Sequence, residues 1–203
     1  MKRTLAALFA LLCIALPLSA QVAGQSESDG TDYFGGLHKK GSQIISLTTG
    51  AGIPLFILPA DPSATSDYPL GVGASFSLNY EYFVANRLAI GGSLTGAFNT
   101  TVGGRTLFMA PVALKLGYWW GTAPLEYTVG MDMGLNIVRL SGNGVITPFI
   151  KTGGGAFVQL SQSWSLGGQL YWWFIPEVHF GSSASLNRYG NFLEISIAAL
   201  YHF

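Results

Sequence analysis

In the stretch NFLEISIAALYHF, residues 191–203, apolar residues recur at every second position. One face carries the residues Leu193, Ile195, Ile197, Ala199, Tyr201 and Phe203. The other face is mixed and includes Glu194, Ser196 and His202. Strict alternation with a period of two predicts a β-strand whose faces meet different surroundings.

The same alternation recurs in seven earlier segments, residues 43–57, 70–84, 88–102, 106–120, 125–138, 146–160 and 164–175. In the first of them, Ile45, Leu55 and Ile57 fall on the apolar side. The segments are longer than the usual strand of about five or six residues. Tight turns at ANR, GTAP and SQS occupy every second junction, and the others include two long polar loops, residues 58–69 and 178–190. This pattern predicts an all-β fold, an eight-stranded antiparallel up-and-down barrel.

The composition indicates what surrounds the barrel. The chain is 49% hydrophobic but only 10% charged, with a formal net charge of zero, whereas soluble domains carry about 25% charged residues. A neutral chain without a basic cluster also excludes nucleic acid as a partner. A soluble barrel with its apolar face inward needs a charged outer face, but the polar face here is mostly Gly, Ser, Thr and Asn. The apolar face is almost free of charge, as expected in lipid, where one Arg or Lys at the bilayer midplane costs about 2–4 kcal/mol. We therefore expect a transmembrane barrel.

Aromatic residues on the apolar face gather near the tight-turn ends of the segments. Because Trp and Tyr favour the bilayer interface, we expect an aromatic girdle there, made of Tyr80, Tyr82, Tyr118, Trp120, Tyr127, Trp164, Tyr201 and Phe203.

The first 20 residues have the layout of a secretory signal peptide, with Lys2 and Arg3 before an apolar run and small residues up to Ala20. Cys13 raises a lipoprotein alternative, although it follows Leu12 where a small residue is needed. Cleavage after Ala20 leaves no cysteine. We expect residues 21–41 to form a flexible periplasmic tail and residues 42–203 to form the barrel.

The signal peptide, the eight segments and the terminal aromatic strand together resemble the small eight-stranded outer-membrane barrels of the OmpW, OmpX and OmpA-barrel types. In that class the last strand resembles the signal read by the barrel assembly machinery, which maps here onto Ile195, Ile197, Ala199, Tyr201 and Phe203. The resemblance implies a multi-pass protein of the cell outer membrane, with membrane lipid and the assembly machinery as partners. An OmpW-like member implies a narrow pore for small or hydrophobic molecules with a lateral opening in its wall. Pro111 and Pro148 mark either such a gap or a bulge.

Charges on the polar face are expected to point into the lumen. They are Glu81, Lys115, Glu126, Asp132, Lys151 and Glu194, joined by His202. Two interpretations follow, either a buried ion-pair network that fills the lumen or a polar conduit for a small solute. With a plugged lumen, the function becomes that of a surface-exposed, antigenic barrel that contacts a host molecule through residues 58–69 and 178–190.

Catalysis and metal binding have weak support in the sequence. A lipid-modifying barrel enzyme needs Ser, His and an acid at the outer rim, and the chain offers His179, Ser182 and Ser183 with Asp61 or Asp67. Their spacing does not match the deacylase type, and mere presence does not set the required geometry. His38, His179 and His202 lack metal-ligand spacing. We therefore expect no enzymatic activity, no cofactor and no metal.

Overall fold

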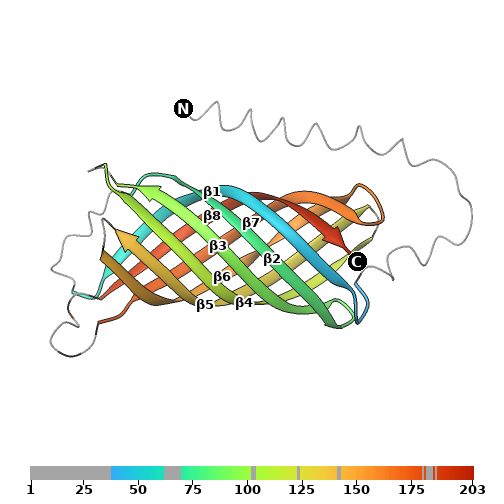
Figure 1. The fold of residues 1–203 in the computed structure, drawn as a ribbon, viewed down its shortest axis with the longest axis horizontal. Coiled ribbons are helices and arrows are strands. Elements are labelled where there is room, and N and C mark those ends of the chain that lie inside the picture. The colour runs from blue at the N-terminus through green and yellow to red at the C-terminus, as the bar shows by residue number, and fades with distance from the viewer. Residues whose placement is uncertain are drawn as a thin grey trace, which may run out of the picture. The chain divides into compact units, whose positions relative to one another are not determined.

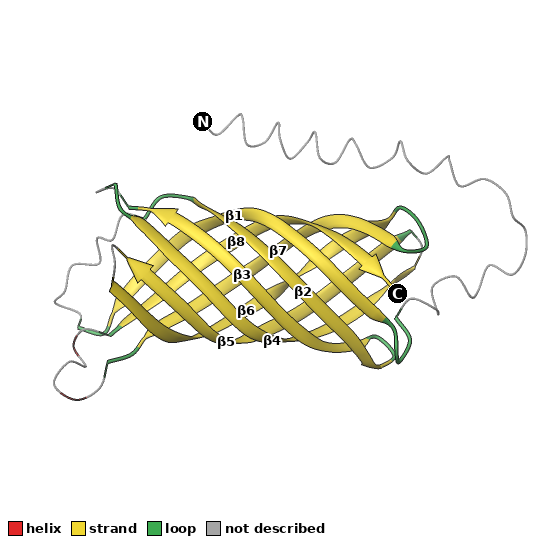
Figure 2. Ribbon diagram, in the orientation of Figure 1, coloured by secondary structure: helices red, strands yellow, loops and turns green. Residues whose placement is uncertain are grey.

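The computed structural model describes residues 38–61, 70–101, 104–122, 124–140, 143–179, 181, 185 and 187–203. These residues form one closed barrel of eight strands, tilted to its axis (Figures 1 and 2). The strands are β1 (Gln43–Pro59), β2 (Gly73–Ala85), β3 (Leu88–Thr100), β4 (Thr106–Thr122), β5 (Leu125–Leu140), β6 (Asn143–Gln159), β7 (Trp164–Glu177) and β8 (Arg188–His202). The predicted signal peptide, Cys13 and the tail up to residue 37 lie outside the described residues.

Each strand pairs antiparallel with its neighbours in the sequence, and β1 pairs with β8 from Ile44↔His202 to Pro59↔Arg188. The predicted eight-stranded up-and-down barrel is therefore confirmed. The β2–β3, β4–β5 and β6–β7 turns lie at one end, together with the start of β1 and the end of β8 (Figure 1). We call this end the termini end and the opposite end the loop end.

The two faces of the wall follow the alternation of the sequence. On β8, Ile195 and Ile197 are exposed on the outside, while Glu194 and Ser196 are buried inside. On β4, Leu114 is 73% exposed beside the buried Lys115. The prediction that the apolar face points outward is confirmed. The described residues contain no helix that is long and apolar enough to cross a membrane.

Strict alternation fails on β1. The register with β8 shifts between Pro54 and Phe56, so that Leu55 is an extra residue in a β-bulge. Beyond the bulge Phe56 and Leu58 are exposed, whereas Ile57 is partly buried. The assignment of Ile57 to the apolar outer face is wrong, because one inserted residue exchanges the faces of everything after it.

Pro111 and Pro148 interrupt pairing without causing bulges. On either side of Pro111 the β3–β4 register is the same, with Leu94↔Val112 and Ala97↔Met109, but the intervening pairs are missing. Between β6 and β7 the pair nearest the loop end, within the described residues, is Ile150↔Phe174. Each proline removes a ladder donor, so these two places are local breaks in the wall.

Candidate functional site

The lumen contains the polar chemistry of the molecule, and Glu194 lies at its centre. Glu194 Oε2 is 2.9 Å from Lys151 Nζ and accepts a 2.7 Å hydrogen bond from Trp173 Nε1. Ser75 donates to Glu194 Oε1 at 3.2 Å. The carboxylate is only 1% exposed. A buried charge is tolerated when it is paired and hydrogen-bonded, and Glu194 meets both conditions.

Lys115 forms a second centre on β4, which β5 separates from Lys151 on β6. Its Nζ lies 3.5 Å from Asp132 Oδ1 and 4.0 Å from Glu81 Oε1. It also donates to the Tyr171 hydroxyl at 3.4 Å. Glu81 in turn accepts a 3.0 Å hydrogen bond from Trp119 Nε1.

The ring of Tyr171 joins the two centres. Lys115 Nζ is 5.3 Å and Lys151 Nζ 4.6 Å from its centroid, and Lys151 lies 5.1 Å from the ring of Trp173. Ammonium groups at this distance from an aromatic face are attracted by the ring quadrupole. Both lysines are thus held by carboxylates and rings inside the lumen.

Glycines on the inner face make room for the rings. A Cβ added at Gly153 would lie 2.8 Å from Tyr171 Cδ1, and one at Gly167 would lie 2.5 Å from Phe157 Cδ1. Real Cβ atoms do not approach this closely, so each ring lies over a bare backbone of the neighbouring strand. This explains why small residues dominate the polar face: they leave the volume that the large inward side chains occupy.

Apolar side chains close the lumen towards the loop end. The buried cluster there consists of Ala97, Met109, Ala113, Phe149, Tyr171, Trp173, Ile175 and Phe192. Phe149 and Trp173 pack edge to face at 5.2 Å. A cavity of about 10 Å³ lies beside this cluster, between Ser75, Asn99 and Trp173, and it is close to the smallest space that holds one water molecule.

A different layer closes the termini end. Phe83, Trp119 and Phe157 are buried with Ile44 and Leu200, and Trp119 packs on Phe157 at 5.6 Å. The side chain of His38, which precedes β1, lies against this layer and is 8% exposed.

Glu126 belongs to this layer. Its Oε2 lies 3.3 Å from His38 Nε2 and 3.8 Å from His202 Nε2. Ser165 Oγ donates to Glu126 Oε1 at 2.9 Å and contacts His202 Nε2 at 2.9 Å.

The lumen charges predicted from the sequence thus fall into three sets. Lys115, Asp132 and Glu81 form one cluster and Lys151 with Glu194 another, both in mid-barrel, whereas Glu126 is set apart with histidines. Tyr171, Trp173, Ser165 and His38 were not predicted from the sequence as part of the lumen site. The alternation on β7 places Tyr171 and Trp173 inward and so signalled them, but His38 precedes the first periodic segment and carried no signal.

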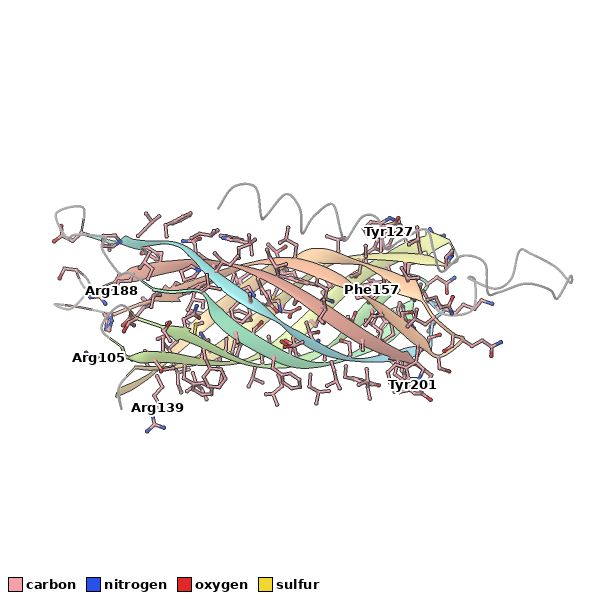
Figure 3. The ribbon with its side chains drawn as sticks, turned by 90° about the horizontal axis from the view of Figure 1, so that it is seen from above. Arg105, Tyr127, Arg139, Phe157, Arg188 and Tyr201 are labelled. Atoms are coloured by element: carbon pink, nitrogen blue, oxygen red, sulfur yellow. The ribbon has the colours of Figure 1, made fainter. Side chains whose placement is uncertain are left out.

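The predicted girdle residues all lie on the outer face near the termini end, with exposures from 36% for Tyr127 to 51% for Phe203. Figure 3 shows Tyr127 and Tyr201 at this end and Arg105, Arg139 and Arg188 at the other. Neighbouring rings touch, as in the pairs Trp120–Tyr127 at 6.0 Å and Trp164–Tyr201 at 5.0 Å. The final strand presents Ile195, Ile197, Tyr201 and Phe203 on the same outer face.

Only some of the catalytic candidates lie within the described residues. His179 Nε2 lies 3.1 Å from Glu177 Oε1, while Ser182, Ser183 and Asp67 lie outside the described residues. The buried Ser165, His202 and Glu126 do not form a nucleophile, base and acid in series, because serine and carboxylate both lie at the Nε2 side of the imidazole. Within the described ranges no group of three His, Cys, Asp or Glu residues fits a metal ion.

Comparisons with known proteins agree with this architecture. A protein-family model matches residues 25–201. The chain is 25% identical over 172 residues to an uncharacterized protein of Borreliella burgdorferi, and the alignment covers 73% of this chain and 78% of that protein.

Two solved structures are similar in fold. Neisserial surface protein A superposes with a TM-score of 0.56 at 13% identity, covering 81% of this chain and 98% of its own. The outer membrane protein OprG of Pseudomonas aeruginosa gives a TM-score of 0.50 at 12% identity, covering 82% and 97%. At these identities the likeness shows the fold alone, that of small outer-membrane barrels. The resemblance to that class is confirmed, and the OmpW-like subtype stays a prediction.

Proposed function

The chain belongs to the family whose model matches residues 25–201. We propose that it is an integral outer-membrane barrel that does not conduct, because its fold is that of such barrels and its lumen is filled. It acts as a surface-exposed protein whose contacts are made at the loop end. The observation that carries the proposal is that the lumen is filled by three successive layers of buried side chains.

Each layer fills the lumen with a different kind of side chain. The aromatic layer at the termini end contains Trp119 at 2% and Phe157 at 0% exposure. The middle layer is held by ion pairs around Lys115 and Lys151. The apolar layer at the loop end leaves a cavity for about one water molecule. An eight-stranded barrel is just wide enough for such filling, which favours a structural plug over a conduit.

Three features support a place in the outer membrane. The outer face is apolar through the strand centres, with Leu114 at 73% and Ile197 at 63% exposure. Aromatic rings gather at the termini end of that face, where a bilayer interface favours them. The fold is that of solved outer-membrane barrels. The apolar positions of β8 are the part that we expect the assembly machinery to bind.

A non-conducting barrel exercises its function at the loop end. The longest connections, between β1 and β2 and between β7 and β8, include most of residues 58–69 and 178–190, and these are the segments through which it contacts a host molecule. One solved relative in fold is named a surface protein, which agrees with this role. No enzymatic step, cofactor or metal is part of the proposal.

A second function, passage of small hydrophobic molecules through the wall, is favoured by the break beyond Ile150↔Phe174. It lies beside the apolar layer, where Phe149 and Ile175 are buried. Such a molecule enters sideways between β6 and β7 and does not need the axial path.

Planar-bilayer conductance of the refolded chain tests the first function. We expect no channel events over a wide voltage range for the natural chain, with a general porin as positive control. Discrete openings of the natural chain contradict the proposal. A double variant, Trp119→Ala with Phe157→Ala, shows how far the mid-barrel ion pairs close the lumen without the termini-end layer.

Transfer of a fluorescent fatty acid across vesicles that contain the protein tests the second function. Pro148→Val restores a backbone donor on β6, and it should slow transfer if the break is the route. Leu135→Val, a change on the outer face of β5, is the matched control. Equal transfer with and without the natural protein excludes passage.

A further inference from the structure

The segment before β1 is fastened to the termini end by backbone hydrogen bonds. Arg87 N donates to His38 O at 2.8 Å, Gly41 N donates to Phe83 O at 2.8 Å, and Phe83 N donates to Ser42 O at 3.0 Å. Lys40 N donates to the side chain of Asn86 at 3.2 Å. These contacts run along the end of β2 and its turn into β3, and they bring His38 over the barrel mouth.

The imidazole of His38 enters the mouth. Its ring stacks on Phe83 with centroids 5.2 Å apart and lies 5.3 Å from Trp119. It is 8% exposed, although it belongs to a segment outside the strands. Among the described residues, His38 therefore adds to the plug at this end although it lies outside the strands.

The charge balance of this plug depends on protons. Glu126 is fully buried, and its partners among the described residues are His38, His202 and the hydroxyl of Ser165. No lysine or arginine of the described chain pairs with it. A buried carboxylate is stabilised by a compensating positive charge, and one proton on either histidine would make the group neutral as a whole.

We propose that His38 is a proton-released latch on the N-terminal segment. One bound proton holds the latch closed, because the positive histidine and Glu126 attract each other. A second proton makes both histidines positive around one carboxylate, with their ring centroids 6.0 Å apart. This net charge in a buried site is relieved when one histidine moves into water.

The two histidines differ in how firmly the fold holds them. His202 lies in β8, paired with Ile44, and its backbone N–H donates to Ser163 O at 2.8 Å. His38 lies outside the strands, and its segment is held by the Arg87 N–H on its carbonyl and by the hydrogen bonds of Lys40, Gly41 and Ser42. Acidification therefore releases His38 and leaves His202 paired with Glu126.

The remaining charged groups near His38 do not compensate the positive charge that the second proton brings. Glu81, reached through the indole of Trp119, is already paired with Lys115 in the middle layer. Arg87 contacts His38 through its backbone, and Lys39 and Lys40 are exposed. The strands that enclose the ring otherwise present Ile44, Phe83, Ala89, Phe157 and Leu200.

A spin label at residue 39 reports the state of the latch. The full chain carrying Cys13→Ala and Lys39→Cys is labelled, refolded and studied by electron paramagnetic resonance from pH 8 to pH 5, a range in which histidine takes up a proton. We expect an immobilised label at pH 8 and a mobile one at pH 5. The ratio of mobile to immobile label should change by about tenfold for each pH unit over which one proton is bound.

Two variants separate the latch from a merely structural role. His38→Phe keeps a ring in the mouth but binds no proton, and its label should stay immobile at pH 5. Glu126→Gln removes the compensating charge, so the first proton already opens the latch and release moves to higher pH. A natural chain that stays immobile at pH 5, or is already mobile at pH 8, overturns the proposal, and so does release in His38→Phe. The result is independent of conductance, so it stands or fails separately from the proposed function.

Discussion

The outer and inner faces of the barrel are made by the same eight strands, but the outer face exposes apolar side chains and the inner face buries charged ones. On the outer face, Leu114 and Ile197 are largely exposed, and their side chains contain no polar atom that needs a hydrogen bond. On the inner face, Lys151 and Glu194 are almost fully buried and are satisfied by each other and by neighbouring side chains. The outside therefore needs an apolar solvent, whereas Lys151 and Glu194 on the inside satisfy each other without solvent. This difference predicts how the two faces respond to substitution.

The largest effect is expected on the inner face. Lys151→Met removes the 2.9 Å partner of Glu194 and leaves a buried carboxylate with only neutral donors. Loss of one partner of a buried ion pair costs about 3–5 kcal/mol. Urea unfolding in lipid vesicles, followed by tryptophan fluorescence, measures the change.

The matched control for Lys151→Met is Lys39→Met, which changes an exposed lysine outside the strands. We expect its unfolding free energy to stay close to that of the natural chain. If Lys151→Met is equally harmless, the ion pair does not support the lumen.

The outer face gives the next effect. Leu114→Arg places a charge on the most exposed large apolar position of the described wall. In lipid vesicles this should lower the free energy of unfolding by about 2–4 kcal/mol if residue 114 lies near the bilayer midplane. Leu114→Ile is the control and should be nearly neutral. Equal stability of the arginine variant in vesicles would show that this face does not meet hydrocarbon.

Sequence alone predicts the face to which each residue of the wall points better than it predicts the contacts inside the lumen, and the reason is physical. Period-two alternation fixes which face a residue points to, and it therefore placed Lys115, Glu194 and the outward aromatics from local pattern alone. It fails where one residue is inserted, as at Leu55 on β1. One insertion is invisible in the pattern because Phe56 and Ile57 are both apolar.

Contacts across the lumen are harder to predict, because they join strands that are distant in sequence. The bond between Ser75 and Glu194 spans 119 residues and depends on the shear of the closed barrel. The pairing of Glu126 with His38 depends on a segment that has no periodicity at all. Sequence pattern places Glu126 inside the lumen but cannot choose its partner among the charges at that end.

The smallest effect on the free energy of unfolding is expected when a glycine is replaced by alanine on each face of the wall. Gly153→Ala puts a Cβ within 2.8 Å of the Tyr171 ring and against the backbone oxygen of Leu170. Overpacking of this kind costs about 1–3 kcal/mol. Gly92→Ala, with its Cβ 3.7 Å from the nearest atom, has ordinary contacts and should be neutral or slightly stabilising. Urea unfolding of both variants in vesicles measures the difference. If Gly153→Ala is as stable as Gly92→Ala, the ring of Tyr171 can move away, and the inner face is not packed tightly enough to exclude a solute.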